Sequence, residues 1–214
     1  SHAYVSRRTA VLLGRAYADV NVITLHLGNG ASACAVAGGR SVATSMGLSP
    51  LEGLVMGTRS GDIDPAIVFH LWRNAGMSVD EIDHLLNHRS GLLGLCGAND
   101  MREVLRRRAA GDAAAALAFD VYCRRITAYV GAYYALLGRV DAITFTAGIG
   151  ENAADVRAAA LANLERLGIA VSPERNTTGT GERIISPEGA EVAVCVVPTD
   201  EEREIATQTL LAVR

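Results

Sequence analysis

An α/β fold is predicted for this chain by its order of apolar strands and helices and by two glycine-rich turns at strand ends. The first three strands follow one another through Gly-Asn-Gly and Gly-Gly turns as an antiparallel meander, whereas helices separate the last two. We therefore expect a mixed five-stranded sheet flanked by helices. The strands are expected at Val22–Leu27, Ala31–Ala37, Arg40–Thr44, Ala142–Thr146 and Val192–Val197.

The helices are predicted from their end signals and their periodicity. Pro65 stands in the first turn of one helix, and Ser78 and Glu81 form the capping box of the next. The polar segment Glu174–Glu188 is expected to be a surface loop or short hairpin. Helices are expected at Arg7–Tyr17, after Pro65, and at Ser78–His88, Asn99–Ala109, Asp112–Leu137, Ala153–Leu167 and Asp200–Val213.

The composition limits the class of protein. With 214 residues, half of them hydrophobic, the chain can bury a large core without disulfides. A formal net charge of −3 argues against nucleic acid or an anionic membrane as the main partner. The four cysteines lack CxxC spacing, so we expect reduced thiols in a cytoplasmic protein. The chain starts without methionine or an obvious first strand, and we expect it to be a fragment.

All 20 basic residues are arginine. The absence of lysine excludes a P-loop, which needs its lysine after the glycines, and it excludes Schiff-base chemistry. A phosphate bound here would therefore be stabilised by arginine, histidine or a metal ion. Arginine suits that task because its planar guanidinium bonds phosphate oxygens in pairs.

The first glycine turn is bracketed by His26 and Asn29, which a plain hairpin does not need. Asn29 can donate to a phosphate oxygen while it tolerates turn geometry. His26 is equally compatible with a supporting histidine of the core and with direct phosphate contact.

Arg59 lies among small residues in the glycine-rich segment Ser49–Pro65. The structural alternative is a salt bridge to Asp62 or Asp64. We favour stabilisation of a phosphate by Arg59, with the two aspartates positioning it or ordering the water of a metal ion.

The second glycine turn, Gly148–Asn152, is expected to be a loop that brings backbone N–H groups to a helix N-terminus, where anions are favoured. Glu151 and Asn152 are consistent with simple capping. The carboxylates after Pro198 follow a buried strand, where one of them could hold Mg²⁺ through water. From the pattern alone, ordinary helix-end electrostatics is the better interpretation of those carboxylates.

Two further features are interpreted as structural. His84 and His88 are four residues apart on a helix, but no third metal ligand is evident, so we expect them to be solvated. An aromatic stripe at helical spacing is typical of core or a subunit interface. It comprises Phe119, Tyr122, Ile126, Tyr129, Tyr133 and Leu136.

Taken in order, these motifs resemble the acetate kinase family of the actin-like, ribonuclease H-like superfamily of acetate and sugar kinases. The resemblance covers residues 1 to about 211, and the start of the chain matches the end of the family's H-G-T-S-H-x-Y-V motif. A departure is LCGAND, which replaces a serine-rich run before the family's D-x-R. The matching segments are SHAYVS, HLGNG, TSMGLSPLEGLVMGTRSGDIDP, RSGLLGL, FTAGIGEN and PTDEE.

The resemblance implies roles for individual residues. His2 and Arg59 are implied to stabilise the transferring phosphoryl group, and Glu201 to associate with Mg²⁺, which reverses the interpretation of PTDEE from the pattern alone. The implied phosphate loop is His26, Leu27, Gly28, Asn29 and Gly30; the adenosine contacts are Asp100, Met101 and Arg102; and the nucleotide loop is Gly148, Ile149, Gly150, Glu151 and Asn152.

The resemblance also implies an activity, namely reversible transfer of the γ-phosphoryl group of ATP to acetate, giving acetyl phosphate and ADP. Mg²⁺, or Mn²⁺ in its place, would be the cofactor, and the enzyme would be a homodimer. Residues 1–214 would form the nucleotide-binding C-terminal domain, with the N-terminal half absent and the fragment inactive alone. A propionate or butyrate kinase, or a non-catalytic nucleotide-binding module, remains as an alternative.

Overall fold

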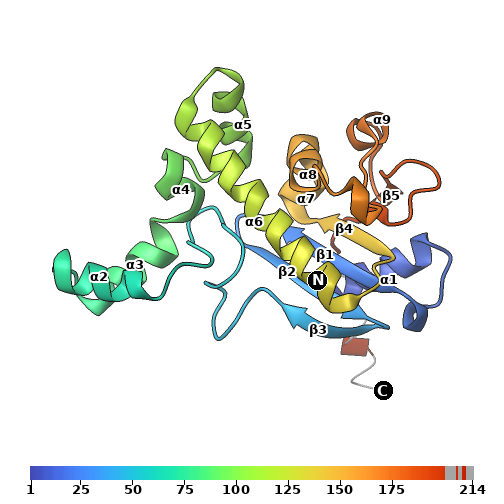
Figure 1. Ribbon diagram of the computed structural model, residues 1–214, viewed down its shortest axis with the longest axis horizontal. Coiled ribbons are helices and arrows are strands. Elements are labelled where there is room, and N and C mark those ends of the chain that lie inside the picture. The colour runs from blue at the N-terminus through green and yellow to red at the C-terminus, as the bar shows by residue number, and fades with distance from the viewer. Residues whose placement is uncertain (201–205, 207–208, 211–214) are drawn as a thin grey trace. The chain divides into compact units, whose positions relative to one another are not determined.

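The computed structural model describes residues 1–200, 206, 209 and 210. The chain divides into two compact units. Figure 1 labels the helices and strands along the chain. Most of the predicted helix Asp200–Val213, including Glu201, lies outside the described residues. The first unit comprises Ser1–Leu27, Cys34–Ala43 and Gly131–Arg214, and the second comprises Gly28–Ala33 and Thr44–Val130.

A mixed sheet lies mainly in the first unit, with the strand order β3-β2-β1-β4-β6-β5. Strands β1, β4 and β6 run parallel, and β5 is antiparallel to β6. The described part of the sheet has six strands rather than the predicted five, because two residues of the segment expected to be a surface loop or short hairpin pair antiparallel with β6. The strands are β1 (Asn21–Leu27), β2 (Ala31–Ala37), β3 (Arg40–Thr44), β4 (Ala142–Thr146), β5 (Arg183–Ile184) and β6 (Ala193–Val196).

Helix α1 (His2–Leu12) packs on β1 and β4 and shares a buried apolar core with β1, β4 and β6. The predicted helix Arg7–Tyr17 was wrong at both ends. The helix ends early because Gly14 adopts a φ of +64°, and its N–H then donates to the carbonyl of Val11. A short 3₁₀ turn, η1 (Tyr17–Asp19), leads into β1.

The glycine-rich segment after β4 is helical, not the predicted loop. Helix α7 (Ala147–Asn152) begins at the strand end, and α8 (Ala154–Ala160) follows after the non-helical residue Ala153. The predicted helix Ala153–Leu167 therefore starts one residue later than expected and ends early, at Ala160. The rest of the segment contains a 3₁₀ turn, η2 (Glu165–Leu167), and a short helix, α9 (Pro173–Thr177).

The second unit is built from helices. Ser78 and Glu81 form the predicted capping box, and three residues of the aromatic stripe, Phe119, Tyr122 and Ile126, are buried as expected of core. Helix α4 was not predicted. The helices are α2 (Ala66–Asn74), α3 (Val79–His88), α4 (Gly91–Cys96), α5 (Met101–Ala109) and α6 (Ala113–Leu137), of which α6 continues into the first unit.

The four cysteines are free thiols, and all four are buried. Burial raises the pKa of Cys195 and that of Cys123 to about 12, so both are protonated at neutral pH. Within the described part of the chain, no helix is both long and apolar enough to cross a membrane.

Candidate nucleotide and phosphate site

In the first unit, the candidate residues gather at the carboxyl edge of the parallel strands. In the β1–β4 register His26 lies opposite Thr146, and in the β4–β6 register Phe145 lies opposite Val196. The end of β1, the start of α7 and residues 198–200 therefore meet along one edge. Ligands of open α/β sheets bind at this edge.

Helix α7 is held at its C-terminal end by Arg157, a residue that is only 2% exposed. The Arg157 Nη1 atom donates to the carbonyls of Gly150 and Glu151, each at 2.9 Å, while Nε and Nη2 donate to Asn176. Burial lowers the pKa of Arg157 to about 10, which leaves it cationic at neutral pH. A buried cation that binds neutral carbonyls matches the negative end of a helix dipole.

The side chains of Glu151 and Asn152 bond within the first unit. The Asn152 amide donates to the carbonyl of Gly148 at 2.8 Å, within α7, so it does not form the side-chain cap of α7 or α8 that the sequence suggested. The Glu151 carboxylate accepts from the N–H of Thr199 at 3.3 Å, which joins α7 to the segment after β6. Gly148 is exposed at the start of the helix, and Gly150 is buried.

His2 and His26 lie together in the first unit. The His2 ring, on the first turn of α1, is 6.3 Å from the His26 ring between centroids, and its Nδ1 atom is 2.7 Å from Thr24 Oγ1. The His26 Nδ1 atom is 3.0 Å from Ser1 Oγ. Burial, followed by the neighbouring His26, lowers the pKa of His2 to about 4. His2 is therefore a neutral imidazole at pH 7, able to donate one hydrogen bond but carrying no charge.

The candidate phosphate turn lies in the second unit from Gly28 onward. The N–H of Gly28 donates to the carbonyl of Gly30, and the N–H of Gly57 donates to that of Asn29, both at 2.9 Å. Asn29 is exposed and its side chain lies against Gly57, where any Cβ would overlap its amide oxygen. The preceding residue, Leu27, is fully buried in the first unit, so its side chain belongs to the core.

Arg59 lies against the same turn. Its Nη1 atom is 3.4 Å from the position that a Cβ on Gly30 would take, and it donates to the carbonyl of Pro50 at 3.3 Å. The described residues offer Arg59 no carboxylate partner. A half-buried guanidinium beside a glycine turn is able to bind the oxygens of an anion.

Asp62 and Asp64 bond to partners other than Arg59, so the direct contact with Arg59 is not formed, while their ordering of a metal ion's water stays a prediction. Asp62 accepts hydrogen bonds from the N–H of Gly53 and the hydroxyl of Tyr129, both at 2.8 Å, and pairs with Arg125. Asp64 accepts from the N–H of Ala66 and so starts α2. Asp62 therefore connects the loop that contains Arg59 to α6, whereas Asp64 stabilises the start of α2.

Sequence reasoning missed the residues that hold the Arg59 loop in place. The N–H groups of Ser90 and Leu92 donate to the carbonyls of Thr58 and Met56, each at 2.9 Å. Gly91 has a φ of +58°, and a Cβ there would collide with the Met56 carbonyl. The signal was the RSGLLGL segment, whose first glycine marks a close backbone approach.

The D-x-R segment opens helix α5. Asp100 is its N-cap and accepts from the N–H of Arg102 at 2.8 Å, and the two side chains form an ion pair. Hydrogen bonds from Arg102 lower the pKa of Asp100. Arg102 is 91% exposed in its side chain, whereas Met101 is buried. Only the two charged residues present side chains to solvent.

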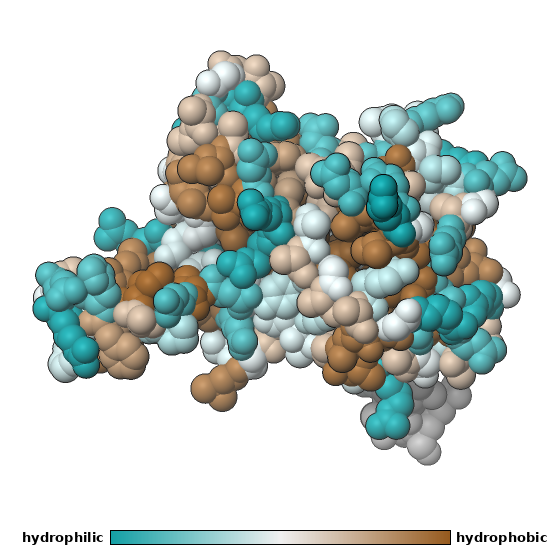
Figure 2. All heavy atoms as spheres, in the orientation of Figure 1, coloured by the Kyte–Doolittle hydropathy of each residue, from teal (hydrophilic) through white to brown (hydrophobic). Residues whose placement is uncertain are grey.

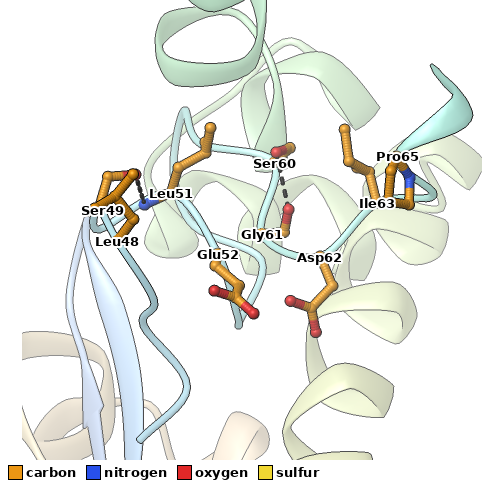
Figure 3. A pocket seen from close by; sticks show the side chains of 9 residues that line it. All are labelled: Leu48, Ser49, Leu51, Glu52, Ser60, Gly61, Asp62, Ile63 and Pro65. Carbon is orange, nitrogen blue, oxygen red and sulfur yellow. Dashed lines mark hydrogen bonds between the residues drawn. The ribbon is translucent and has the colours of Figure 1, made fainter. Parts of the chain in front are cut away.

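A pocket of about 330 Å³ lies beside the Arg59 loop in the second unit. Figure 3 shows the carboxylates of Glu52 and Asp62 pointing to the same side of it, below Ser60. Among the described residues no group of three His, Cys, Asp or Glu could hold a metal ion. His84 and His88 are exposed, as expected, with ring centroids 5.0 Å apart.

A family model described as the acetokinase family matches residues 1–207. The chain belongs to the acetokinase family. Acetate kinase of Streptomyces avermitilis is 70% identical over 210 residues, which cover 98% of this chain and 52% of that protein. Acetate kinase of Streptomyces griseus is 71% identical over 214 residues, which cover 100% and 52%. The chain thus spans about half the length of these curated relatives.

Solved structures of acetokinase-type enzymes share the fold. An acetate kinase of Porphyromonas gingivalis matches with a TM-score of 0.97 at 42% identity, covering 100% of this chain and 54% of that one. A propionate kinase of Francisella tularensis matches with a TM-score of 0.89 at 46% identity, covering 94% and 51%. The expected α/β fold, with a mixed sheet and flanking helices, is confirmed.

Proposed function

We propose that the protein containing this chain is an acetate kinase, which transfers the γ-phosphoryl group of ATP to acetate and works reversibly. The observation that carries the proposal is the Arg59 guanidinium, which lies on the Gly28–Gly30 turn with no carboxylate partner among the described residues. Identity of 70% to an acetate kinase supports the choice of reaction.

The proposed reaction does not need a strong general base. Acetate is already a nucleophile at neutral pH, and the transferring group passes through a metaphosphate-like state, so positioning and charge stabilisation dominate. Arg59 supplies the positive charge, and neutral His2 donates an N–H to the phosphoryl oxygen. The turn His26–Gly30 is proposed to bind the phosphates of the nucleotide. Residues Asp100–Arg102 are proposed to contact its adenosine, and Gly148–Asn152 to line the rest of the nucleotide site.

The proposed cofactor is Mg²⁺, with Mn²⁺ able to replace it. Mg²⁺ binds through one or two carboxylates plus substrate phosphates, so a site needs no cluster of three side chains. The carboxyl edge of the sheet has oxygen donors of this kind, since the Glu151 carboxylate lies there beside Thr199. Glu201, two residues further on, is the proposed associated carboxylate. When bound, the ion neutralises charge on the β- and γ-phosphates.

The preference of the enzyme for the length of the acyl chain is tested by comparing kcat/KM for acetate, propionate and butyrate in the full-length enzyme. We expect acetate to be preferred. Preference for propionate would favour the alternative activity, which the similarity to a propionate kinase supports. Absence of any acyl phosphate product would favour a non-catalytic nucleotide-binding module.

The role of Arg59 is tested by replacing it with alanine in the full-length enzyme. We expect kcat to fall by about 10³-fold, the scale seen when a charge-stabilising arginine is lost from phosphoryl transfer. Arg89→Ala is the matched control, because Arg89 is exposed and its N–H, not its side chain, contacts Leu85. A kcat for Arg59→Ala near that of the wild type would contradict the assigned role.

We also propose that this chain is the nucleotide-binding C-terminal half of a two-domain enzyme that closes around its substrates. This chain covers only about half the length of its acetate kinase relatives, which supports the proposal. The enzyme is proposed to be a cytoplasmic homodimer. Four buried free thiols support a reducing compartment, and the exposed apolar side chains of α2 support a subunit contact.

A further inference from the structure

The hydrogen bond between His2 and Thr24 positions the His2 ring and bears on which of its two nitrogens carries the proton. Thr24 lies in the middle of β1 and is fully buried. Its Oγ1 atom is 2.7 Å from His2 Nδ1 and 3.4 Å from the carbonyl oxygen of Cys34. The hydroxyl has one proton, which the Cys34 carbonyl can accept and which His2 Nδ1 can accept only when that nitrogen carries no proton.

The distances indicate which contact receives the proton. A separation of 2.7 Å is the usual distance for a hydroxyl donor, and it is at the short end of the range of about 2.7–3.2 Å for N–H donors. The Cys34 contact, at 3.4 Å, is beyond the usual range for a hydroxyl donor. These distances favour donation from the Thr24 hydroxyl to His2 Nδ1. An Nδ1 atom that accepts a hydrogen bond carries no proton, so the single proton of the neutral ring is on Nε2.

The tautomer matters because His2 is neutral. A charged imidazolium would carry a proton on both nitrogens whatever Thr24 did. Burial and the nearby His26 ring keep the pKa of His2 at about 4, so near neutral pH only one nitrogen is a donor. The Thr24 hydroxyl also faces the ring, and the amino group of Ser1 lowers the pKa of His2 further.

We propose that Thr24 is a positioning residue, which holds His2 as the Nε2–H tautomer so that Nε2 donates to the transferring phosphoryl group. The phosphoryl part of this statement rests on the proposed function, whereas the tautomer part rests on the contact alone. Second partners of this kind fix the tautomer of a histidine and keep its ring oriented.

Thr144 provides a matched control. It is the register partner of Thr24 on β4 and is also fully buried. Its hydroxyl lies 2.8 Å from that of Thr9 and bonds to the Cys195 thiol. Thr24→Val and Thr144→Val therefore remove the same group from equivalent positions of adjacent strands. Only the first loses a hydrogen bond to His2.

The experiment uses the full-length enzyme as the wild type and as Thr24→Val, Thr24→Ser, Thr144→Val and His2→Gln. The ¹⁵N NMR signals of labelled histidine report which ring nitrogen carries the proton, and His2→Gln identifies the His2 signals by their loss. Steady-state kinetics with acetate and MgATP give kcat and KM. Circular dichroism and a thermal unfolding midpoint check that each variant is folded.

We expect wild-type His2 to show the Nε2–H signature and Thr24→Val to lose it. We expect kcat in Thr24→Val to fall about 10- to 100-fold, as for loss of a partner that orients a functional histidine, with the KM for ATP unchanged. Thr24→Ser keeps a hydroxyl and should restore both properties. Thr144→Val should retain the wild-type kcat.

An Nδ1–H signature in the wild type, or the same His2 spectrum in Thr24→Val as in the wild type, would overturn the proposal. An altered tautomer with an unchanged kcat would also overturn it, provided that His2→Gln is impaired. A wild-type kcat in His2→Gln would instead contradict the assigned function of His2. In that case the spectra would still decide whether Thr24 sets the tautomer.

Discussion

Gly57 shows how one missing side chain shapes the candidate phosphate turn. Its N–H bonds to the carbonyl of Asn29, so the two segments run close together. A Cβ at this position would overlap the Asn29 amide and lie 3.1 Å from the carbonyl oxygen of Asn99. The backbone at Asn99 cannot move as easily as a side chain, so the Asn29 amide would have to turn away.

Replacing Gly57 with alanine should therefore weaken nucleotide binding. A hydrogen bond to a charged group contributes about 1.5–3 kcal/mol, so we expect the affinity for MgADP to fall by at least about tenfold. Isothermal calorimetry of the full-length protein measures it. Gly131→Ala is the control, because Gly131 lies in α6 with no atom within 4 Å of an added Cβ. Equal affinities in the two variants would contradict a phosphate contact by Asn29.

Helix α7 has only six residues, and two of them are glycine. Such a helix is unstable in isolation, because nucleation is costly and each interior glycine costs about 1 kcal/mol relative to alanine. Its packing on β1 and β4 and the bonds from Arg157 to its last carbonyls compensate for this. Sequence patterns predicted a loop because these contacts are not local.

Loss of Arg157 should destabilise the fold. Arg157→Met keeps the length of the side chain but removes the donors to Gly150, Glu151 and Asn176, so we expect a loss of about 3 kcal/mol or more in the free energy of unfolding. Urea denaturation monitored by circular dichroism measures it. Arg166→Met is the control, since Arg166 is exposed and should change stability by less than about 0.5 kcal/mol. Similar losses in both variants would show that Arg157 does not anchor α7.

The elements that the sequence predicted best are those with strong local signals. Strands β2, β3 and β4 have the predicted bounds, and the capping box at Ser78 starts α3 as expected. The misplaced α1 shows the opposite case. Its start depends on packing against the sheet, while the Gly14 signal for its end was present in the sequence and overlooked.

Helix α2 is a candidate for a contact between subunits, because none of its residues is buried. Phe69 and Trp72 are more than half exposed, and Arg73 lies over both rings. Figure 2 shows apolar residues among hydrophilic ones over the α2–α3 region. The aromatic stripe of α6, by contrast, is largely buried and does not supply such a surface. Clustered exposed aromatic residues are typical of protein interfaces.

If α2 forms the proposed homodimer contact, Trp72→Glu should convert the full-length dimer to a monomer, because it would bury two uncompensated charges at a twofold interface. Light scattering coupled to size-exclusion chromatography gives the mass. Leu117→Glu, at a similarly exposed apolar position on α6, should remain dimeric. A dimeric Trp72→Glu protein would place the contact elsewhere, and a monomeric wild type would refute the homodimer.

The amino-acid sequence was enough to predict the α/β class, most strand and helix positions and the motifs of the acetokinase family, because apolar periodicity, turn chemistry and capping act over a few residues. Long-range contacts decided the rest. The partners of Asp62 include Tyr129, 67 positions away, and the helical state of α7 depends on Arg157 and on two strands. The partners available to a polar side chain depend on which distant segments pack beside it, and no local pattern encodes that choice.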